Sequence, residues 1–361
     1  MVSAMVPSQS KTRPLTVESM GSFMGGGMLS ARGRGCNAGR CPLATIGLRR
    51  YRVDVLRRNV LIFHAGALGD FVVSWPLALA LGRLHPQSRI IYVAAGQKGK
   101  LAEKAIRTES LDIEAGWHHL FGAASSLPQA ARKTLENAHS IFTFVASPGD
   151  VWSESVRAIA PEAQVVHIEP RPPEGSTFGG HITQWMAEQL SGVPVIRTGV
   201  DQIMRSIAQR GVGYKRSPEG TVCVHPGGGA EAKRWPAKHY VQLVRKLVKG
   251  RHHVRVLIGE VEREQLPKED LDHFAAVAEL VEPKTYVELL DHLGTADALV
   301  CNDTGPGHLA GIIGTPTFSI FGPESNVDRW RPLGPHVHVK QTEDLAHLSV
   351  EEVFKWVSGE I

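Results

Sequence analysis

Short, almost continuously apolar runs alternate with amphipathic segments from residue 59 onward. Runs of this kind predict strands buried on both faces. In the first half we predict strands at residues 59–63, 89–95, 140–146 and 163–168 and helices at residues 71–84 and 181–190. Alternation of strand and helix is typical of a parallel sheet built from βαβ units.

A second series of the same kind begins after a polar stretch. We predict its strands at residues 221–225, 253–259, 276–281, 298–302 and 316–321, and its helices at 237–249, 286–293, 349–357 and from residue 308. The chain of 361 residues therefore divides into an N-terminal Rossmann-like domain at 58–207, a linker at 208–220 and a C-terminal Rossmann-like domain at 221–361.

Residues 1–57 show neither helical nor strand periodicity and are rich in Ser, Gly, Arg and Met. This composition predicts a disordered extension or an over-extended start. This segment also changes the meaning of the net charge of +4, because residues 1–58 hold ten Lys/Arg but only two Asp/Glu. The remainder has 30 basic and 34 acidic residues, and its basic residues are dispersed, which argues against nucleic-acid binding.

Cysteine and apolar content narrow the class of protein further. Four cysteines are too few for a disulfide framework in a chain of this length, and Cys223 and Cys301 lie in apolar strand-like runs, which favours a reducing compartment such as the cytoplasm. No apolar run approaches the roughly 20 residues that span a bilayer.

The first loop with candidate chemistry follows the strand at 59–63. It places Gly66 and Gly69 between a buried strand and a helix, where the backbone can turn tightly and approach a ligand. The dinucleotide fingerprint is absent because His64 stands where its first glycine belongs. Asp70 follows the turn, either as a first-turn carboxylate that the helix dipole stabilises or as a general base.

The second loop, HPGGGAEAKRWP, opens the second half. Backbone N–H groups around Gly228 and Gly229, together with the ammonium of Lys233, can form a phosphate cradle. It is not a P-loop, because no Gly-Lys-Ser/Thr occurs. The alternative is a solvated loop in which Trp235 packs as an anchor and Pro236 begins a helix.

The third loop, NDTGPGHLAG, follows the strand at 298–302. Asp303 and Thr304 come at its carboxyl end, and Gly305 and His308 lead into a helix. Ligands bind at this edge of open α/β sheets, and the helix N-terminus offers free N–H donors to an anion. A plain capping role would use the same Asp and Thr.

A metal site has weaker support. Asp270 and Asp272 have the spacing of an aspartate pair in metal-dependent sugar transferases, but they lie in a charged segment without a preceding buried strand. We therefore expect a solvated face there, with no metal ligands in this chain.

Taken together, the three loops and their flanking strands resemble glycosyltransferase family 9, the heptosyltransferases that extend the inner core of lipopolysaccharide. The resemblance covers residues 59–361. It implies a GT-B fold with two Rossmann-like domains facing a central cleft. It also implies inverting, metal-independent transfer of a sugar, with ADP-heptose as the expected donor, no further cofactor, and a lipid-linked or oligosaccharide acceptor. Such an acceptor would bring the cytoplasmic enzyme to the inner membrane surface.

Residue by residue, the resemblance implies that Asp70 is the base, beside the acceptor-side turn of Gly66 and Gly69. It implies that Lys233 binds phosphate and that the turn from Asp303 to Gly305, with His308, binds the donor. A carboxylate of the run GEVERE, Glu260 or Glu262 with preference for Glu262, would bind the ribose. Two alternatives stay open at this point: a GT-B sugar-nucleotide epimerase, and a catalytically silent nucleotide-sugar binding protein.

Overall fold

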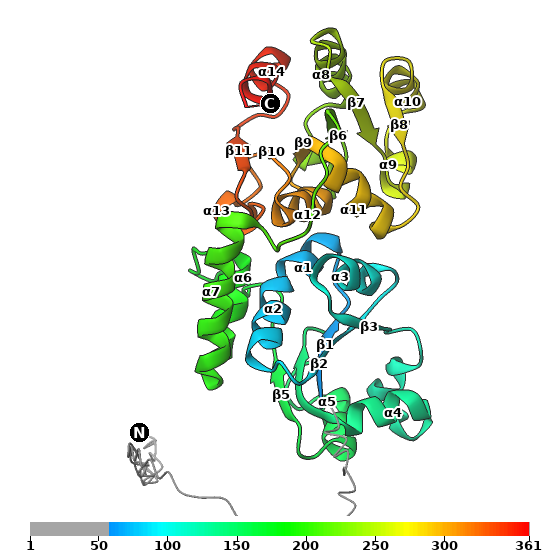
Figure 1. The fold of residues 1–361 in the computed structure, drawn as a ribbon, viewed down its shortest axis with the longest axis vertical. Helices are drawn as coiled ribbons and strands as arrows, with labels where there is room; N and C mark the ends of the chain where they lie inside the picture. Colours follow the sequence, from blue (N-terminus) through cyan, green and yellow to red (C-terminus); the bar gives the residue numbers. More distant parts are fainter. Residues whose placement is uncertain (1–57, 361) are drawn as a thin grey trace, which may run out of the picture. The chain divides into compact units, whose positions relative to one another are not determined.

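Residues 58–360 are described by a computed structural model, and they form two parallel α/β sheets (Figure 1). The predictions for residues 1–57, a disordered extension or an over-extended start, concern residues outside this part. The first sheet has the strand order β3-β2-β1-β4-β5 and the second β11-β10-β9-β6-β7-β8, with every pairing parallel. The predicted pair of Rossmann-like domains is confirmed.

The first sheet is built from short strands joined by helices. Its strands are β1 (Asn59–His64), β2 (Arg89–Ala94), β3 (Glu109–Asp112), β4 (Ala138–Thr143) and β5 (Gln164–His167). Its helices are α1 (Leu68–Val73), α2 (Trp75–Leu84), α3 (Lys98–Ile106), α4 (Gln129–Glu136), α5 (Val151–Ile159), α6 (Ile182–Glu188) and α7 (Pro194–Arg210), with short 3₁₀ turns at Trp117–Phe121, Ala124–Ser126 and Gln189–Gly192.

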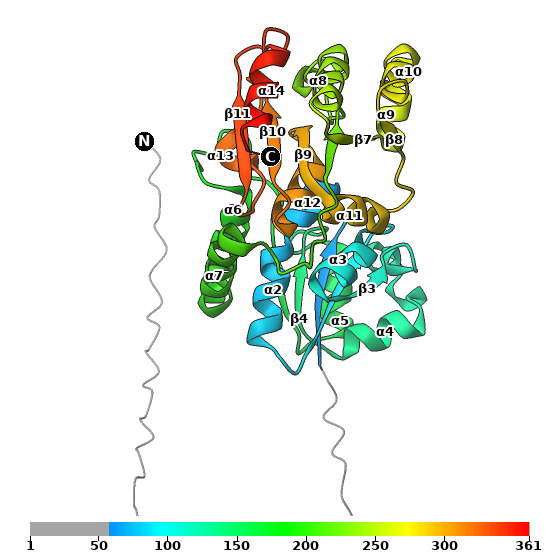
Figure 2. The ribbon, with the colours of Figure 1, turned by 45° about the horizontal axis from the view of Figure 1, so that its top comes forward.

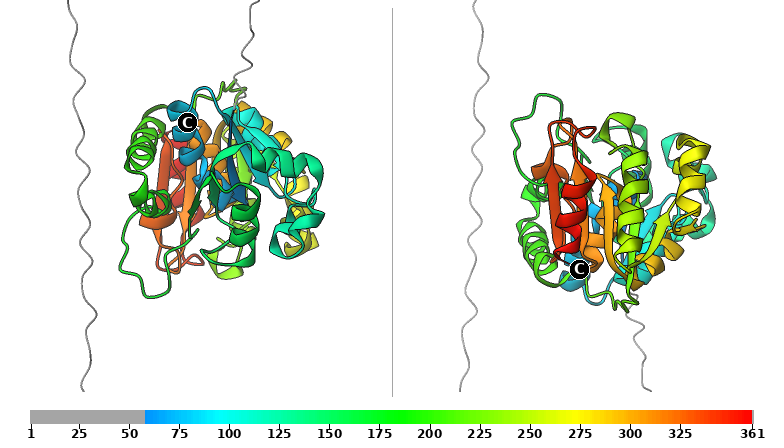
Figure 3. Two further views of the ribbon diagram at one scale, coloured as in Figure 1. Left: turned by 90° about the horizontal axis from the view of Figure 1, so that it is seen from below. Right: turned by 90° about the horizontal axis from the view of Figure 1, so that it is seen from above.

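The second sheet repeats the pattern. Its strands are β6 (Thr221–His225), β7 (His253–Leu257), β8 (Glu279–Val281), β9 (Ala296–Asn302), β10 (Thr317–Phe321) and β11 (Val337–Gln341). Its helices are α8 (Ala237–Lys249), α9 (Glu260–Gln265), α10 (Lys268–Ala275), α11 (Tyr286–Thr295), α12 (Gly305–Ile313), α13 (Val327–Trp330) and α14 (Val350–Ser358), and a 3₁₀ turn covers Glu231–Lys233. Helices cover both faces, as two further directions of view show (Figure 2, Figure 3).

Central strands are buried on both faces, as their apolar runs predict. In β1, Val60 and Ile62 point into one apolar core, whereas Leu61 and Phe63 point into another. In β6 the alternation is the same, with Val222 on one face and Cys223 on the other. One of these cores contains side chains from both sheets, so the two halves of residues 58–360 share apolar packing.

The helix predicted at residues 71–84 is wrong in its boundaries. The structure has two helices there, α1 and α2, and Ser74 is both the C-cap of α1 and the N-cap of α2. Pro76 has no N–H to continue the hydrogen-bond ladder, and the Ser74 hydroxyl donates to the Phe71 carbonyl at 2.7 Å. The first helix also begins three residues earlier than predicted, at Leu68.

Helix α7 was not predicted from the sequence. It buries Ile196, Val200, Ile203 and Ile207 at helical spacing against the shared core. Pro194 at its start and glycine within it weaken the local helix signal, so packing determines its formation. It extends to Arg210 and therefore includes the first three residues of the stretch predicted as a linker. Within residues 58–360, no helix is long and apolar enough to cross a membrane.

Candidate active site

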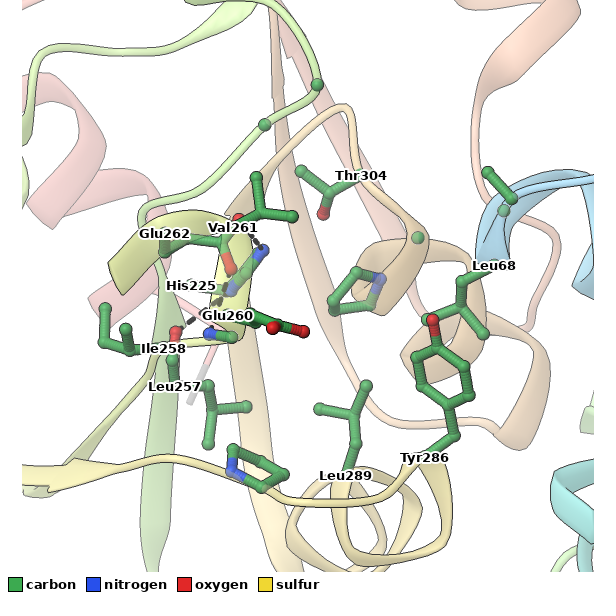
Figure 4. Close-up of a pocket in the computed structure, with 18 of the residues that line it drawn as sticks. Leu68, His225, Leu257, Ile258, Glu260, Val261, Glu262, Tyr286, Leu289 and Thr304 are labelled. Carbon is green, nitrogen blue, oxygen red and sulfur yellow. Dashed lines mark hydrogen bonds and ion pairs between the residues drawn. The ribbon is translucent and has the colours of Figure 1, made fainter. Parts of the chain in front are cut away.

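A cavity of about 560 Å³ lies where the carboxyl ends of strands from both sheets meet (Figure 4). The first sheet contributes the turn and first residues of α1 together with Gln97, and the second contributes the ends of β6 and β7 and the starts of α9, α11 and α12. Parallel α/β sheets bind ligands at this edge, and the volume suits a ligand of nucleotide-sugar size.

The predicted site residues divide into two groups around this cavity. Its wall contains residues from all three glycine loops and from the start of α9: Gly69, Gly228, Gly229, Glu262, Thr304 and Gly305. The remaining predicted residues, Gly66, Asp70, Lys233, Asp303 and His308, are not in this wall. Gly66 and Asp303 directly precede wall residues, Asp70 directly follows one, His308 lies against Gly69, and Lys233 contacts Asp303. The structure therefore brings the three loops together.

Asp70 is the third residue of α1, and its carboxylate is largely covered, with 14% of the side chain exposed. Gly66 permits this position, because a Cβ there would lie 3.0 Å from Asp70 Cβ and 2.9 Å from His64 Cε1. The α1 cap is Ala67, and no side chain caps the helix. A carboxylate in the first turn is therefore compatible with the helix dipole, but Asp70 does not act as the N-cap.

Two cations from distant parts of the chain surround the Asp70 carboxylate. The Arg171 guanidinium donates to its oxygens at 3.2 and 3.3 Å and also lies over the ring of Trp330, at 5.4 Å from the ring centre. The Lys98 ammonium donates to the Gly66 carbonyl at 2.7 Å. Burial lowers the pKa of Lys98, whereas the charge of Asp70 raises it. Asp70 thus lies in a field of positive charge.

Two buried histidines lie beside α1. Burial lowers the pKa of His64 and of His308 to about 4, although the Asp70 charge raises both. Both rings are therefore neutral near pH 7. Within residues 58–360, His308 Nδ1 and His64 Nε2 have no hydrogen-bond partner.

The N-termini of α1 and α12 approach each other closely through two glycines. A Cβ at Gly69 would lie 3.1 Å from His308 Cδ2, and a Cβ at Gly305 would lie 2.9 Å from Leu68 Cβ. Larger residues at either place would separate the two helices. The contact brings the helix that contains Asp70 next to the helix N-terminus that follows Asp303.

The loop after β6 is held by Asn302, whose side chain is fully buried. Its carbonyl oxygen accepts from Trp235 N and the Tyr240 hydroxyl, each at 3.0 Å, and its amide donates to the carbonyls of Pro226 and Gly227 at 3.1 and 2.8 Å. All four hydrogen-bonding positions of this amide are used. The loop that contains Gly228 and Gly229 is therefore fixed by the last residue of β9.

Lys233 lies on the 3₁₀ turn that follows this loop. Its ammonium is 3.8 Å from Asp303 Oδ2, which also accepts from the Ser325 hydroxyl at 3.1 Å. Burial raises the pKa of the Asp303 carboxyl, and Lys233 and the Ser325 hydrogen bond oppose that rise. About a third of the Lys233 side chain is exposed, so the ammonium can reach a ligand while Asp303 holds it.

Thr304 is the N-cap of α12, where its hydroxyl accepts from Gly307 N at 3.4 Å. Pro306 has no N–H and the Gly307 N–H is bonded to Thr304, so the Gly305 N–H remains as a donor at this helix N-terminus, where the helix dipole also favours an anion. A capping role for Thr304 is therefore compatible with an anion site at this turn, and Thr304 and Gly305 both line the cavity.

The two candidate carboxylates at the start of α9 have different surroundings. Glu262 is buried; its carboxylate accepts from Gly259 N at 2.9 Å and lies 3.8 Å from His225 Nε2. Glu260 is exposed and points into the cavity (Figure 4). The structure assigns a helix-capping role to Glu262 and leaves the Glu260 carboxylate available to a ligand.

Arg171, Lys98 and Asn302 were missed by the sequence reasoning. Arg171 lies in a Pro/Gly-rich stretch that resembles a plain loop, and its contact with Asp70 spans 101 residues. Asn302 stands directly before Asp303, so its position at the end of a buried strand could have indicated a structural polar residue. The discounted pair Asp270 and Asp272 lies on α10. No group of three His, Cys, Asp or Glu residues among 58–360 could hold a metal ion.

Comparisons with known proteins agree with this geometry. Residues 190–354 match the family model described as glycosyltransferase family 9 (heptosyltransferase). A segment of 107 residues is 33% identical to lipooligosaccharide heptosyltransferase 2 of Haemophilus influenzae; it represents 27% of this chain and only 30% of that protein.

Two solved structures share the fold over most of their length. The E. coli heptosyltransferase WaaC with ADP aligns with a TM-score of 0.60 at 15% identity, over 84% of this chain and 100% of its own. E. coli ADP-heptose LPS heptosyltransferase II aligns with a TM-score of 0.62 at 17% identity, over 83% of this chain and 98% of its own. At these identities the similarity establishes the GT-B arrangement of two Rossmann-like domains.

Proposed function

The chain belongs to glycosyltransferase family 9, and we propose that it transfers heptose from ADP-heptose to a glycan acceptor such as the inner core of lipopolysaccharide. One observation supports this most strongly. Asp70 directly follows Gly69, which lines the cavity, and Thr304 and Gly305 at the start of α12 line the same cavity. A proton acceptor and an anion-binding helix N-terminus thus approach one cavity from two domains.

The donor would occupy the C-terminal side of the cavity. Its diphosphate would lie against the first turn of α12 and within reach of Lys233, and its ribose hydroxyls would bond to Glu260, which has a free carboxylate. Adenosine diphosphate is the proposed nucleotide because related structures contain ADP and ADP-2-deoxy-2-fluoro heptose. The glycan acceptor would approach from the side of Asp70.

The proposed reaction is a single inverting displacement. The acceptor hydroxyl attacks the anomeric carbon, its proton passes to the Asp70 carboxylate, and the bond from the anomeric carbon to the diphosphate breaks. A positioned base contributes about 10²- to 10⁴-fold to such a step. The negative charge that develops on the diphosphate is stabilised by Lys233 and by the N-terminus of α12, both already in place. We propose that these groups replace a divalent metal ion.

A lipid-linked acceptor would bring this enzyme to the cytoplasmic face of the inner membrane. This location follows from the acceptor alone and is testable by fractionation with and without lipopolysaccharide-containing membranes. Release of enzyme into the soluble fraction in both conditions would contradict it.

The test of the function separates donor binding from chemistry. Wild-type enzyme should convert ADP-heptose and a deacylated inner-core oligosaccharide into ADP and an extended oligosaccharide, detected by mass spectrometry. Asp70→Ala should lower kcat by about 10²- to 10⁴-fold, with ADP-heptose affinity near that of wild type, because a base acts in the transition state. Consumption of donor without acceptor would instead indicate an epimerase.

Lys233→Ala should behave differently from Asp70→Ala. Loss of one charge-assisted hydrogen bond to the diphosphate weakens donor affinity by about 1.5 to 3 kcal/mol and also lowers the rate. Lys238→Ala, an exposed lysine on α8, is the matched control and should leave both unchanged. If Asp70→Ala loses donor binding while folded, or Lys233→Ala changes neither quantity, the assignment of base and phosphate clamp fails.

A further inference from the structure

A second cavity of about 480 Å³ lies away from the proposed donor site, between α6, α7 and the glycine-rich residues 177–180. Its wall contains charged side chains of both signs, Arg197 and Asp201 from α7 and Glu188 from the end of α6. The residues of this wall take no part in the proposed transfer chemistry.

The charged side chains of this wall are unpartnered. Within residues 58–360, the side chains of Arg197, Asp201 and Glu188 form no hydrogen bond or ion pair. Gln184 accepts from His181 N through its oxygen at 2.8 Å, which leaves its amide N–H groups free. The cavity therefore presents several donors and acceptors together, at a place where the protein itself does not use them.

The distribution of charge selects the class of ligand. An anion would be repelled by Asp201 and Glu188, and a cation by Arg197, because like charges placed together cost free energy. A neutral molecule with many hydroxyl groups can donate to the carboxylates and accept from the guanidinium and the amide. Phe178, the largest apolar residue of the wall, offers a surface for the C–H face of a sugar ring.

We propose that this cavity is a saccharide subsite that holds a part of the glycan acceptor remote from the reacting hydroxyl. The inference rests on the proposed function for the identity of the glycan. Arg171, which contacts Asp70, precedes residues 177–180 of the cavity wall in the same loop. Thr177 comes six positions after Arg171, so the chain between them spans at most about 20 Å. A single acceptor oligosaccharide can therefore extend from the base to the cavity.

Direct binding tests the subsite without turnover. Deacylated inner-core oligosaccharide is titrated calorimetrically into the full chain in the absence of donor. Arg197→Ala and Asp201→Ala should each weaken its binding about tenfold, the loss expected when one charged hydrogen bond is removed. Gly179→Phe should weaken it as well by narrowing the cavity, since a Cβ at Gly179 meets no atom within 4 Å and the backbone there has room for a side chain.

Arg205→Ala is the matched control, because Arg205 is an exposed arginine of the same helix and lies outside the cavity wall. It should bind the oligosaccharide as wild type does. ADP affinity and the thermal midpoint measured for every variant identify any that fail to fold. In the transfer assay, the cavity variants should raise the acceptor KM about tenfold with kcat within about twofold.

The outcomes separate this inference from the proposed function. Unchanged oligosaccharide affinity in the two charge variants, or no binding to wild type, overturns the subsite even if transfer proceeds. Saturable binding that Arg197→Ala weakens supports the subsite even if ADP-heptose proves not to be the donor. Binding of inorganic phosphate that competes with the oligosaccharide and is lost in Arg197→Ala would indicate an anion site and overturn the saccharide assignment.

Discussion

Replacing Asn302 by alanine removes one small side chain that holds the donor-side loop. The amide is fully buried and makes four hydrogen bonds, two as acceptor from Trp235 N and the Tyr240 hydroxyl and two as donor to the carbonyls of Pro226 and Gly227. None of these four partner groups has another hydrogen bond within residues 58–360. Alanine would leave all four without a partner.

The expected loss follows from this count. A hydrogen bond contributes about 1 kcal/mol net, and a buried group left without its partner costs about 1 to 3 kcal/mol, so four bonds predict roughly 4 kcal/mol. At about 2 to 4 °C per kcal/mol, the thermal midpoint should fall by about 8 °C or more. The loop with Gly228 and Gly229 should also lose its fixed conformation, which lowers ADP affinity by at least about tenfold.

Thermal unfolding with and without ADP measures both effects. Asn326→Ala is the matched control: this exposed asparagine caps α13 through one bond to Arg329 N at 3.0 Å, and its loss should cost about 1 kcal/mol. Asn302→Asp has the same size but cannot donate to the two carbonyls, and it should also be destabilised. A midpoint for Asn302→Ala within about 2 °C of Asn326→Ala, or an Asn302→Asp variant as stable as wild type, would refute the hydrogen-bond argument.

Three further predictions concern other parts of the site. Gly305→Ala should lower kcat at unchanged fold, because its Cβ would collide with Leu68 and displace α1 from α12; kinetics and circular dichroism check this, and full activity would contradict it. Burial lowers the pKa of His64, His181 and His308 to about 4 in the folded protein, whereas a histidine in the unfolded chain has a pKa near 6.5. Between these two pH values the unfolded chain binds more protons than the folded protein, so the free energy of unfolding should fall as the pH drops from 6.5 to 4. His181→Gln should therefore reduce proton uptake on unfolding at pH 5 by about one; unchanged uptake would mean that the native ring is already charged. Addition of EDTA should leave transfer intact, and its abolition with rescue by Mg²⁺ would contradict metal independence.

The sequence alone determined the architecture and the places where chemistry gathers. The side chains of a continuous apolar strand such as β1 point to both faces of the sheet, so both faces must be buried. Amphipathic helices between such strands indicate crossover connections, which join parallel strands. Glycine loops at strand ends, with Asp70, Lys233 and Asp303 beside them, indicated a site at the sheet edges and the family. These signals are local, because a strand, a turn and a helix start each depend on a few neighbouring residues.

Tertiary structure alone decided which distant side chains meet and which carboxylate stays free. Arg171 contacts Asp70 across 101 residues, and Trp330 at the end of α13 lies under the same guanidinium. No local pattern encodes such contacts, since they depend on how both sheets pack through a shared apolar core. The same reason applies to Glu262, which resembled a ribose ligand in sequence: only the approach of Gly259 and His225 shows that its carboxylate already has partners within the protein.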